Sequence, residues 1–236
     1  MEHWLHFARG PMFVAALAVL GLGMARLVLL NGASLAVMLH RTRSHGRTVA
    51  WKRVLHNTFL ALRPFPASGG ARPWYSLLSL VFHLGLLLTP LFLAAHIVLL
   101  ERGFGVGWWA LDPVVADWLT LGTIVSALGL LFLRVGSPLS RAISRPQDYF
   151  LLLLILTPFV TGYLAMHPLL NPWDYDATML VHVLSGNLIL GLLPFTKLSH
   201  VALLPVAQVF GEIGWHLRPK AGEFVAQVLG KENQPI

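Results

Sequence analysis

The sequence has no cysteine among its 236 residues. This absence excludes disulfide bonds, cysteine-ligated iron–sulfur clusters and the CxxCH motif that attaches c-type haem. Any redox group held by this chain must therefore be bound by histidine, methionine, carboxylate or backbone groups. Histidine is plentiful, with 11 residues.

Charged residues are also scarce, at 11% of the chain, whereas soluble domains contain about 25%. Hydrophobic residues make up 56% of the sequence, and the mean hydropathy is +0.69. This composition is typical of an integral membrane protein. The net charge of +7 does not indicate nucleic-acid binding, because the basic residues fall in short segments between long apolar runs.

Five apolar runs have the length of about 20 residues that a membrane-spanning helix needs. The first run has neither a basic start nor a clear A-x-A cleavage site, so we expect a retained helix rather than a signal peptide. We therefore predict one all-α membrane domain over residues 1–236. Its five helices are expected at residues 11–31, 74–100, 114–133, 149–167 and 177–206.

The distribution of basic residues predicts the orientation of these helices. Basic residues gather in alternate connections: Arg41, Arg43, Arg47, Lys52, Arg53, Arg63 and Arg72; then Arg134, Arg141 and Arg145; then Arg218, Lys220 and Lys231 in the tail. By the positive-inside rule, the N-terminus lies outside and the C-terminus in the cytoplasm. We expect a multi-pass protein of a prokaryotic inner membrane. Residues 32–73 form a cytoplasmic loop, and residues 49–62 within it are predicted as a helix on the membrane surface.

Ionisable side chains inside membrane spans are costly and usually functional. Five histidines lie in or at the edge of the predicted spans: His83, His96, His167, His182 and His200. The other six are interpreted as solvated or interfacial: His3, His6, His40, His45, His56 and His216.

Four of these histidines are predicted to pair by depth. The second and fifth helices are antiparallel, so His83 matches His200 near the cytoplasmic side and His96 matches His182 near the outer side. Two bis-histidine sites, one above the other, are what an electron path through two b-type haems across a layer of about 30 Å requires. The alternative is that these histidines hydrogen-bond across helix interfaces without a cofactor.

The spacing of the histidines predicts a shared face on the fifth helix but not on the second. The 18-residue step from His182 to His200 is five whole helical turns, which predicts that both face the same way. The 13-residue step from His83 to His96 is about 3.6 turns, which turns these two apart in a straight helix. A kink at Pro90 or a local π-bulge would restore their alignment. Otherwise the second helix supplies one ligand and the protein holds one haem.

Two stretches resemble a known family. The segment Phe82-His83-Leu84-Gly85, with His96 further along, resembles the second helix of the gamma subunit of respiratory nitrate reductase. The runs His182-Val-Leu-Ser-Gly-Asn and Pro194-Phe-Thr-Lys-Leu-Ser-His200 resemble its fifth helix. The likeness extends to relatives in sulfate-reduction and heterodisulfide-reductase-like membrane complexes, and it covers residues 74–204.

The resemblance implies a cytochrome b subunit with two haems, whose axial ligands are His83, His96, His182 and His200. Such a subunit oxidises a membrane quinol, or reduces a quinone, and exchanges electrons with an iron–sulfur partner subunit. That partner is expected on the cytoplasmic side, where the first basic loop either docks it or is only a topology signal.

Four further residues are candidates for the same chemistry. His167 is a candidate catalytic proton acceptor for quinol, or else an interfacial histidine. Arg26, Arg134 and Lys197 are candidate partners of haem propionates. For Arg134 and Lys197, snorkelling to lipid phosphates is the alternative.

Two other kinds of protein share these features. One is a single-haem cytochrome b anchor of a hydrogenase or formate dehydrogenase complex, which haem stoichiometry would distinguish. The other is a non-redox transporter or assembly protein. A transporter is expected to show repeat symmetry, and the sequence has no visible repeat.

Overall fold

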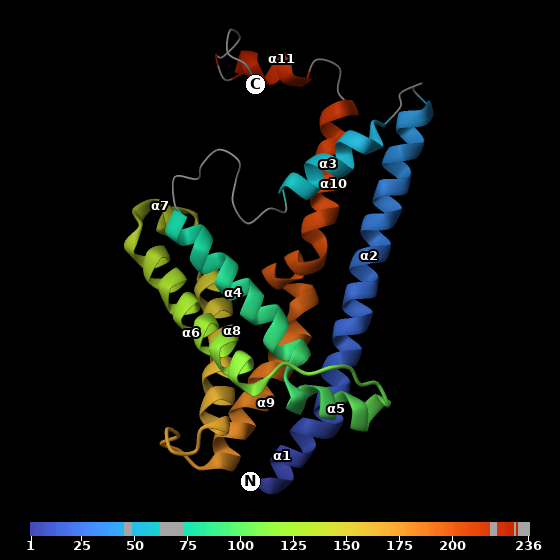
Figure 1. The fold of residues 1–236 in the computed structure, drawn as a ribbon. Helices are drawn as coiled ribbons and strands as arrows, with labels where there is room; N and C mark the ends of the chain where they lie inside the picture. Colours follow the sequence, from blue (N-terminus) through green and yellow to red (C-terminus); the bar gives the residue numbers. More distant parts are fainter. Residues whose placement is uncertain (45–48, 62–72, 218–220, 229, 231–236) are drawn as a thin grey trace. The chain divides into compact units, whose positions relative to one another are not determined.

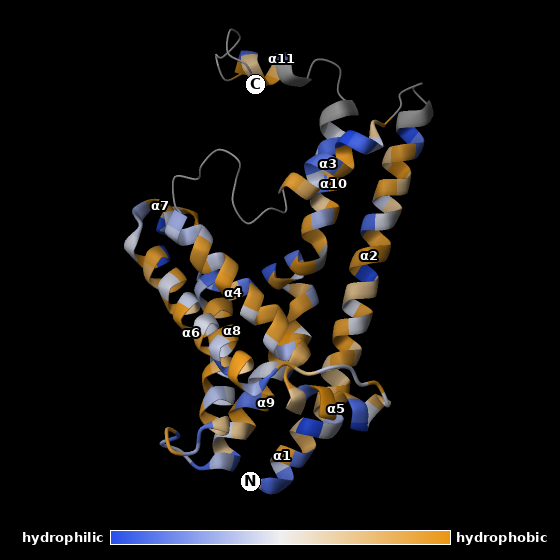
Figure 2. Cartoon of the chain, in the orientation of Figure 1, coloured by the Kyte–Doolittle hydropathy of each residue, from blue (hydrophilic) through white to orange (hydrophobic). Residues whose placement is uncertain are grey.

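A computed structural model describes residues 1–44, 49–61, 73–217, 221–228 and 230. This part of the chain is helical and contains no strand (Figure 1). Five of its helical stretches are long and apolar enough to cross a membrane, and hydrophobic residues run along them (Figure 2). They are Glu2–Arg41, Pro73–Phe92, Pro113–Gly136, Pro146–Met166 and Tyr175–Phe195. The predicted all-α fold with five spans is confirmed, and its orientation stays a prediction.

The first span is longer than residues 11–31 at both ends. It begins with α1 (Glu2–Phe7), continues through a π-helical turn, η1 (Ala8–Met12), that contains Pro11, and runs on as α2 (Phe13–Ser44). The helix continues past Asn31 because the following residues are mostly good helix formers. Asn31 also donates to the carbonyl of Leu27 at 2.8 Å, which satisfies its amide inside the helix. The predicted loop of residues 32–73 therefore starts as helix.

The second predicted helix is broken in two. It consists of α4 (Pro73–Phe92) and α5 (Ala94–Phe104), with Leu93 in an extended conformation between them (φ −72°, ψ 128°). The break follows Pro90, which disrupts helical hydrogen bonding. The connection between α5 and α6 covers the broken end, because Trp108 Nε1 donates to the carbonyl of Leu91 at 2.8 Å.

The third and fourth spans begin with residues that favour the start of a helix. Asp112 caps α6 (Pro113–Gly136), and Ser137 caps the short helix α7 (Pro138–Ile143). Helix α8 (Pro146–Met166) starts with Pro146 at its first position, where a missing N–H costs nothing. The predicted bounds 114–133 and 149–167 are close to these helices.

The helices α4, α6, α8 and α9 (Tyr175–Leu192) pack side by side in that order. Small residues allow the close approach of α4 and α6. A Cβ on Gly85 would overlap the hydroxyl of Thr123 and lie 2.8 Å from the carbonyl of Leu119. At the other side of the bundle, η1 packs on α9, where Asn187 Nδ2 donates to the carbonyl of Ala8 at 2.9 Å.

The fifth predicted helix, residues 177–206, is not continuous. After α9 the chain forms two 3₁₀ turns, η2 (Leu193–Phe195) and η3 (Lys197–Ser199), and then helix α10 (His200–Leu217). Thr196 between the turns is extended (φ −123°, ψ −176°). Because this break lies between His182 and His200, the five-turn argument, which assumes one continuous helix, does not apply to them.

Two short helices belong to the rest of the chain. Helix α3 (Trp51–Ala61) confirms the helix predicted near residues 49–62, while its place on a membrane surface stays a prediction. It packs on α10 through the fully buried Val54 and Ile213, and Asn57 Nδ2 donates to Glu212 Oε2 at 2.8 Å. The last helix is α11 (Ala221–Val228).

The chain divides into two compact units, each described separately below. The first unit comprises Met1–Val19 and Pro64–Leu192, and the second comprises Leu20–Arg63 and Leu193–Ile236. The single domain expected over residues 1–236 stays a prediction. Several residues used for the orientation argument lie outside the described part of the chain: Arg47, Arg63, Arg72, Arg218, Lys220 and Lys231.

Candidate functional site: a histidine pair in the first unit

The structure brings His96 and His182 together. His96 lies in the first turn of α5, directly after the break at Leu93, and His182 lies two turns into α9. Their ring centroids are 5.9 Å apart, and the ring planes differ by 17°. Both side chains are half-buried. We call the end of the bundle where α4 and α8 end and α6 and α9 begin the histidine end.

A backbone carbonyl fixes the tautomer of each ring. Nδ1 of His96 lies 3.0 Å from the carbonyl oxygen of Pro90, and Nδ1 of His182 lies 2.8 Å from that of Pro158. A carbonyl only accepts, so Nδ1–H must donate in both cases. The lone pair of the neutral imidazole is then on Nε2, and this is the arrangement by which proteins orient a histidine to bind a metal.

The fold also makes room for the His182 ring. A Cβ on Gly162 of α8 would lie 2.8 Å from Cε1 and 3.0 Å from Nδ1 of that ring. Glycine at this position lets the ring lie directly against the helix that supplies its hydrogen-bond acceptor, Pro158. Arg9, in the π-helical turn η1, is close enough to His182 for its charge to act on the ring.

The geometry of the pair fits a haem iron held by two imidazoles. Metal–imidazole bonds are about 2 Å long, so two of them in line put the Nε2 atoms about 4 Å apart and the ring centroids about 6 Å apart. The observed centroid distance is 5.9 Å. A bis-histidine haem needs only two protein ligands. Among the described residues, no group of three or more histidine, aspartate or glutamate side chains forms a metal site made of protein ligands alone.

The other two candidate ligands belong to different units. His83 is in α4 of the first unit, and its Nδ1 lies 2.7 Å from the carbonyl of Ser79. His200 starts α10 of the second unit, and its Nδ1 lies 2.7 Å from the carbonyl of Lys197. Both side chains are exposed. Each ring is therefore fixed in the tautomer of His96 and His182, and the pairing of His83 with His200 stays a prediction.

His167 lies at the histidine end with a carboxylate beside it. It caps α8, and its Nδ1 is 2.9 Å from the carbonyl of Tyr163. The Tyr163 ring stacks on the imidazole, with centroids 4.1 Å apart. On the other side, Nε2 lies 3.4 Å from Oδ2 of Asp117, in the second turn of α6. Asp117 is not among the site residues predicted from the sequence.

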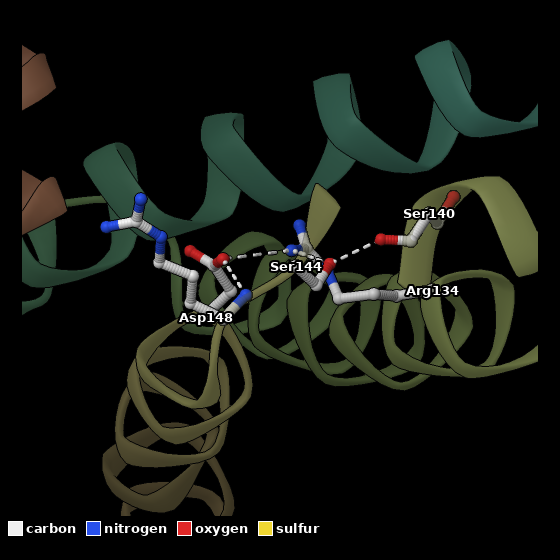
Figure 3. A network of polar contacts seen from close by, with 5 residues as sticks. Arg134, Ser140, Ser144 and Asp148 are labelled. Carbon is white, nitrogen blue, oxygen red and sulfur yellow. Dashed lines mark hydrogen bonds and ion pairs between the residues drawn. The ribbon is translucent and has the colours of Figure 1, made fainter. Parts of the chain in front are cut away.

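The three basic candidates have different surroundings. Arg134 belongs to a polar network at the opposite end of the bundle, where its Nη1 donates to Ser144 Oγ at 3.1 Å and lies 4.0 Å from Asp148 Oδ2 (Figure 3). This network accounts for the charge of Arg134 within the protein. Lys197 in η3 and Arg26 in α2 are exposed. A role of any of the three in binding propionates stays a prediction.

Four residues of the site were missed because their roles depend on tertiary contacts: Gly162, Pro158, Arg9 and Asp117. Gly162 and Pro158 are ordinary members of an apolar helix in the sequence, and Arg9 lies before the predicted first span. Thr89, which directly precedes Pro90, has a buried hydroxyl without a hydrogen-bond partner among the described residues. The one available signal was the presence of proline inside predicted spans, which marks helix breaks and altered hydrogen bonding.

The fold and the histidine pair define an all-helical, multi-pass membrane protein in which two half-buried imidazoles from separate helices lie beside each other. The chain belongs to the family of a curated protein of Nitratidesulfovibrio vulgaris (strain Hildenborough). The two are 34% identical over 218 residues, which are 92% of this chain and 94% of that protein. The name of that relative, "Protein", states no function. No protein-family model matches the chain, and no solved structure matches it.

Proposed function

We propose that this protein is the b-type cytochrome subunit of a prokaryotic respiratory complex. It binds two haems through His96/His182 and His83/His200, and it carries electrons between the membrane quinone pool and an iron–sulfur partner subunit. The partner is needed because a chain without cysteine holds no cysteine-ligated cluster. The proposed location is the cytoplasmic membrane, with the partner on the inner side.

One observation carries this proposal. Two histidines from separate helices lie with their rings 5.9 Å apart, and a backbone carbonyl holds Nδ1 of each. Structural hydrogen bonding alone would be satisfied by one nitrogen per ring, and it gives no reason for two half-buried imidazoles from separate helices to lie beside each other. A pair of imidazoles fixed in this tautomer is the ligand set of a b-type haem.

The residues of the chain do most of the positioning. The break at Leu93 brings His96 under the carbonyl of Pro90, and Gly162 lets the His182 ring lie against α8. A bound haem would accept and donate single electrons, and the protein sets its ligands, its surroundings and therefore its potential.

The quinol is proposed to bind near His96 and His182, with His167 as the acceptor of its protons. His167 lies on α8, the helix that supplies both the Pro158 carbonyl and Gly162 to the His182 ring. Arg26, Arg134 and Lys197 are proposed as partners of haem propionates.

A pyridine haemochrome assay on the purified full-length chain tests the proposal, because it measures haem b per protein. We expect two haems per chain. A well-folded preparation without haem would contradict the cytochrome function and leave a helical membrane protein with an unexplained histidine pair.

The second candidate function is a single-haem membrane anchor. It is favoured by one observation: of the two predicted pairs, His96 and His182 lie within one compact unit, whereas His83 and His200 belong to different units. This function would be supported by a haem content of one per chain that does not change when His83 and His200 are both replaced by alanine.

A further inference from the structure

We infer that Arg9 binds a propionate carboxylate of the haem held by His96 and His182. The inference rests on the proposed function and deepens it, because it names the cation of the chain that orients the acidic edge of the cofactor. Arg9 lies in the π-helical turn η1 of the first unit, and it is not among the site residues predicted from the sequence.

Arg9 is one of two arginines that the protein keeps half-buried. Of the arginines whose exposure the structure describes, only Arg9 and Arg134 are not exposed. Arg134 has partners within the protein, Ser144 and Asp148. The guanidinium of Arg9 makes no hydrogen bond and no ion pair with the described residues. Its N–H donors are therefore available to an acceptor that this part of the polypeptide does not supply.

A charged side chain in this position is costly without a partner. Arg9 belongs to the apolar helical stretch Glu2–Arg41, which is long enough to cross a membrane. Ionisable residues within spans usually pair with an opposite charge or line a functional site. An arginine is suited to a carboxylate, because its planar guanidinium donates two parallel hydrogen bonds to the two oxygens. We therefore expect an anion beside Arg9, and no described carboxylate of the chain fills this role.

The turn that contains Arg9 is fixed against the helix that contains His182. Pro11 lacks an N–H and interrupts the hydrogen bonding of the first helix, which forms the π-helical turn η1 there. Both α1 and η1 pack on α9. Nδ2 of Asn187 donates to the carbonyl of Ala8 at 2.9 Å, and both residues are buried. This bond fixes the backbone directly before Arg9.

From this turn the charge of Arg9 reaches the histidine pair. His182 is close enough for the guanidinium to act on its ring. Pro158 and Gly162 of α8 contact the same ring, so η1 brings Arg9 to the pair from a different helix and a different side. A haem between two imidazoles extends sideways from the line that joins them. A cation beside the pair is therefore placed to meet the edge of the haem, where the propionates are attached.

The other basic candidates are less suited to this haem. Arg26 and Lys197 belong to the second unit, as His200 does, and Arg134 is engaged at the opposite end of the bundle. These three stay candidates for the second haem. The competing partner of Arg9 is a lipid phosphate, which is also an anion and which a snorkelling arginine can reach. The half-burial of Arg9 beside an imidazole favours the cofactor.

The test compares haem with its dimethyl ester, in which the propionates are blocked. Full-length protein is prepared without haem, and its affinity for each compound is measured by titration. We expect Arg9→Gln to weaken the binding of one haem by about 10- to 100-fold, the usual value of a hydrogen bond to a charged group. The wild type and Arg9→Gln should bind the dimethyl ester equally, because the ester leaves no carboxylate for Arg9.

Two further variants separate the charge from its geometry. Arg9→Lys keeps the cation but loses the paired hydrogen bonds, so it should recover part of the affinity for haem. Arg102→Gln removes an exposed arginine from α5, the helix of His96, and should bind haem like the wild type. Resonance Raman spectra provide a readout that a structural role would not move. The propionate bending band should shift in Arg9→Gln and keep its position in Arg102→Gln.

The outcomes are distinguishable from failure of the proposed function. An Arg9→Gln protein that binds haem like the wild type would overturn the inference and leave the cytochrome function intact. Equal loss of affinity for haem and for the dimethyl ester would also overturn it, and would assign Arg9 to a lipid phosphate or to packing. If Arg9→Gln does not fold, Arg9→Lys takes its place, and an unshifted propionate band in that variant contradicts the inference. A wild-type protein that binds no haem would overturn both.

Discussion

The two ends of the bundle formed by α4, α6 and α8 both contain polar clusters, but the clusters are built differently. At the end where α6 turns into α7 and α8, which we call the serine end, each polar group closes a turn. Ser137 caps α7. Ser144 Oγ donates to the carbonyl of Ser140 at 2.7 Å, and Asp148 accepts from the backbone of Arg145 at 2.8 Å (Figure 3). These bonds satisfy the groups that helix ends leave open.

At the histidine end, backbone bonds satisfy only half of each ring. Nδ1 of His96, His182 and His167 is held by a carbonyl, while the first two rings lie beside each other and Nε2 of His167 lies near a carboxylate. The comparison shows that the role of a polar cluster in a membrane protein is best inferred from the polar atoms that its backbone hydrogen bonds do not engage. The polar groups of the serine end bond to one another and to the backbone, and the histidine end is where we propose that a ligand binds.

The largest expected effect comes from removing a ligand at the histidine end. We expect His182→Ala to lose one haem per chain, because a single imidazole no longer holds the iron from both sides. The matched control is His56→Ala on α3, which removes an exposed histidine outside the spans and should keep the full haem content. Haem per protein measures both. Full haem content in His182→Ala would assign the site elsewhere.

A smaller effect is expected when the ring is displaced and not removed. In Gly162→Ala, the new Cβ would lie 2.8 Å from Cε1 of His182, so the ring must leave its preferred rotamer at a cost of about 0.5–1.5 kcal/mol. Haem affinity should fall by about 3- to 10-fold, measured by haem titration. Gly186→Ala on α9, where a Cβ meets no described atom within 4 Å, is the control. Equal affinity in the two variants would mean that Gly162 does not position the ligand.

The packing between the two ends gives a third comparison. Gly85→Ala places a methyl group against Thr123 and the Leu119 carbonyl, so we expect the stability of the bundle to fall by about 1–3 kcal/mol. Thermal unfolding in detergent measures this loss. Gly136→Ala, also with no described atom within 4 Å of its Cβ, should unfold like the wild type. A stable Gly85→Ala protein would show that α4 and α6 are not closely packed.

The smallest effect is expected at the serine end. Ser144→Ala removes the acceptor of Arg134 and should lower stability by about 0.5–1.5 kcal/mol, the usual value of one hydrogen bond. Haem content and spectrum should not change. Loss of haem in this variant would break the comparison, because it would place a cofactor contact at the end that we describe as structural.

The sequence predicted the spans well because each depends on composition over about 20 residues. It also predicted that His96 and His182 lie at the same depth, and their rings are adjacent in the structure. It did not predict the break at residues 193–199, because the run remains apolar and a single proline does not say whether a helix bends or ends.

The site itself depended on contacts that periodicity does not contain. The carbonyl of Pro90 reaches His96 only because the chain is extended at Leu93, three residues later. Asp117 and His167 meet because α6 and α8 pack side by side, although 50 residues separate them in the sequence. Such pairs of single polar residues on different helices become visible only when the packing of those helices is known.

A redox titration of His182→Met against the wild type tests the central claim most directly. Methionine keeps an axial ligand but exchanges imidazole for a thioether, which raises the potential of a b-type haem. We expect one haem of the variant to shift to a higher midpoint potential, or to be lost, while the remaining haem titrates as in the wild type. A variant with the haem content, the spectrum and the potentials of the wild type would contradict the assignment of His182 as a haem ligand.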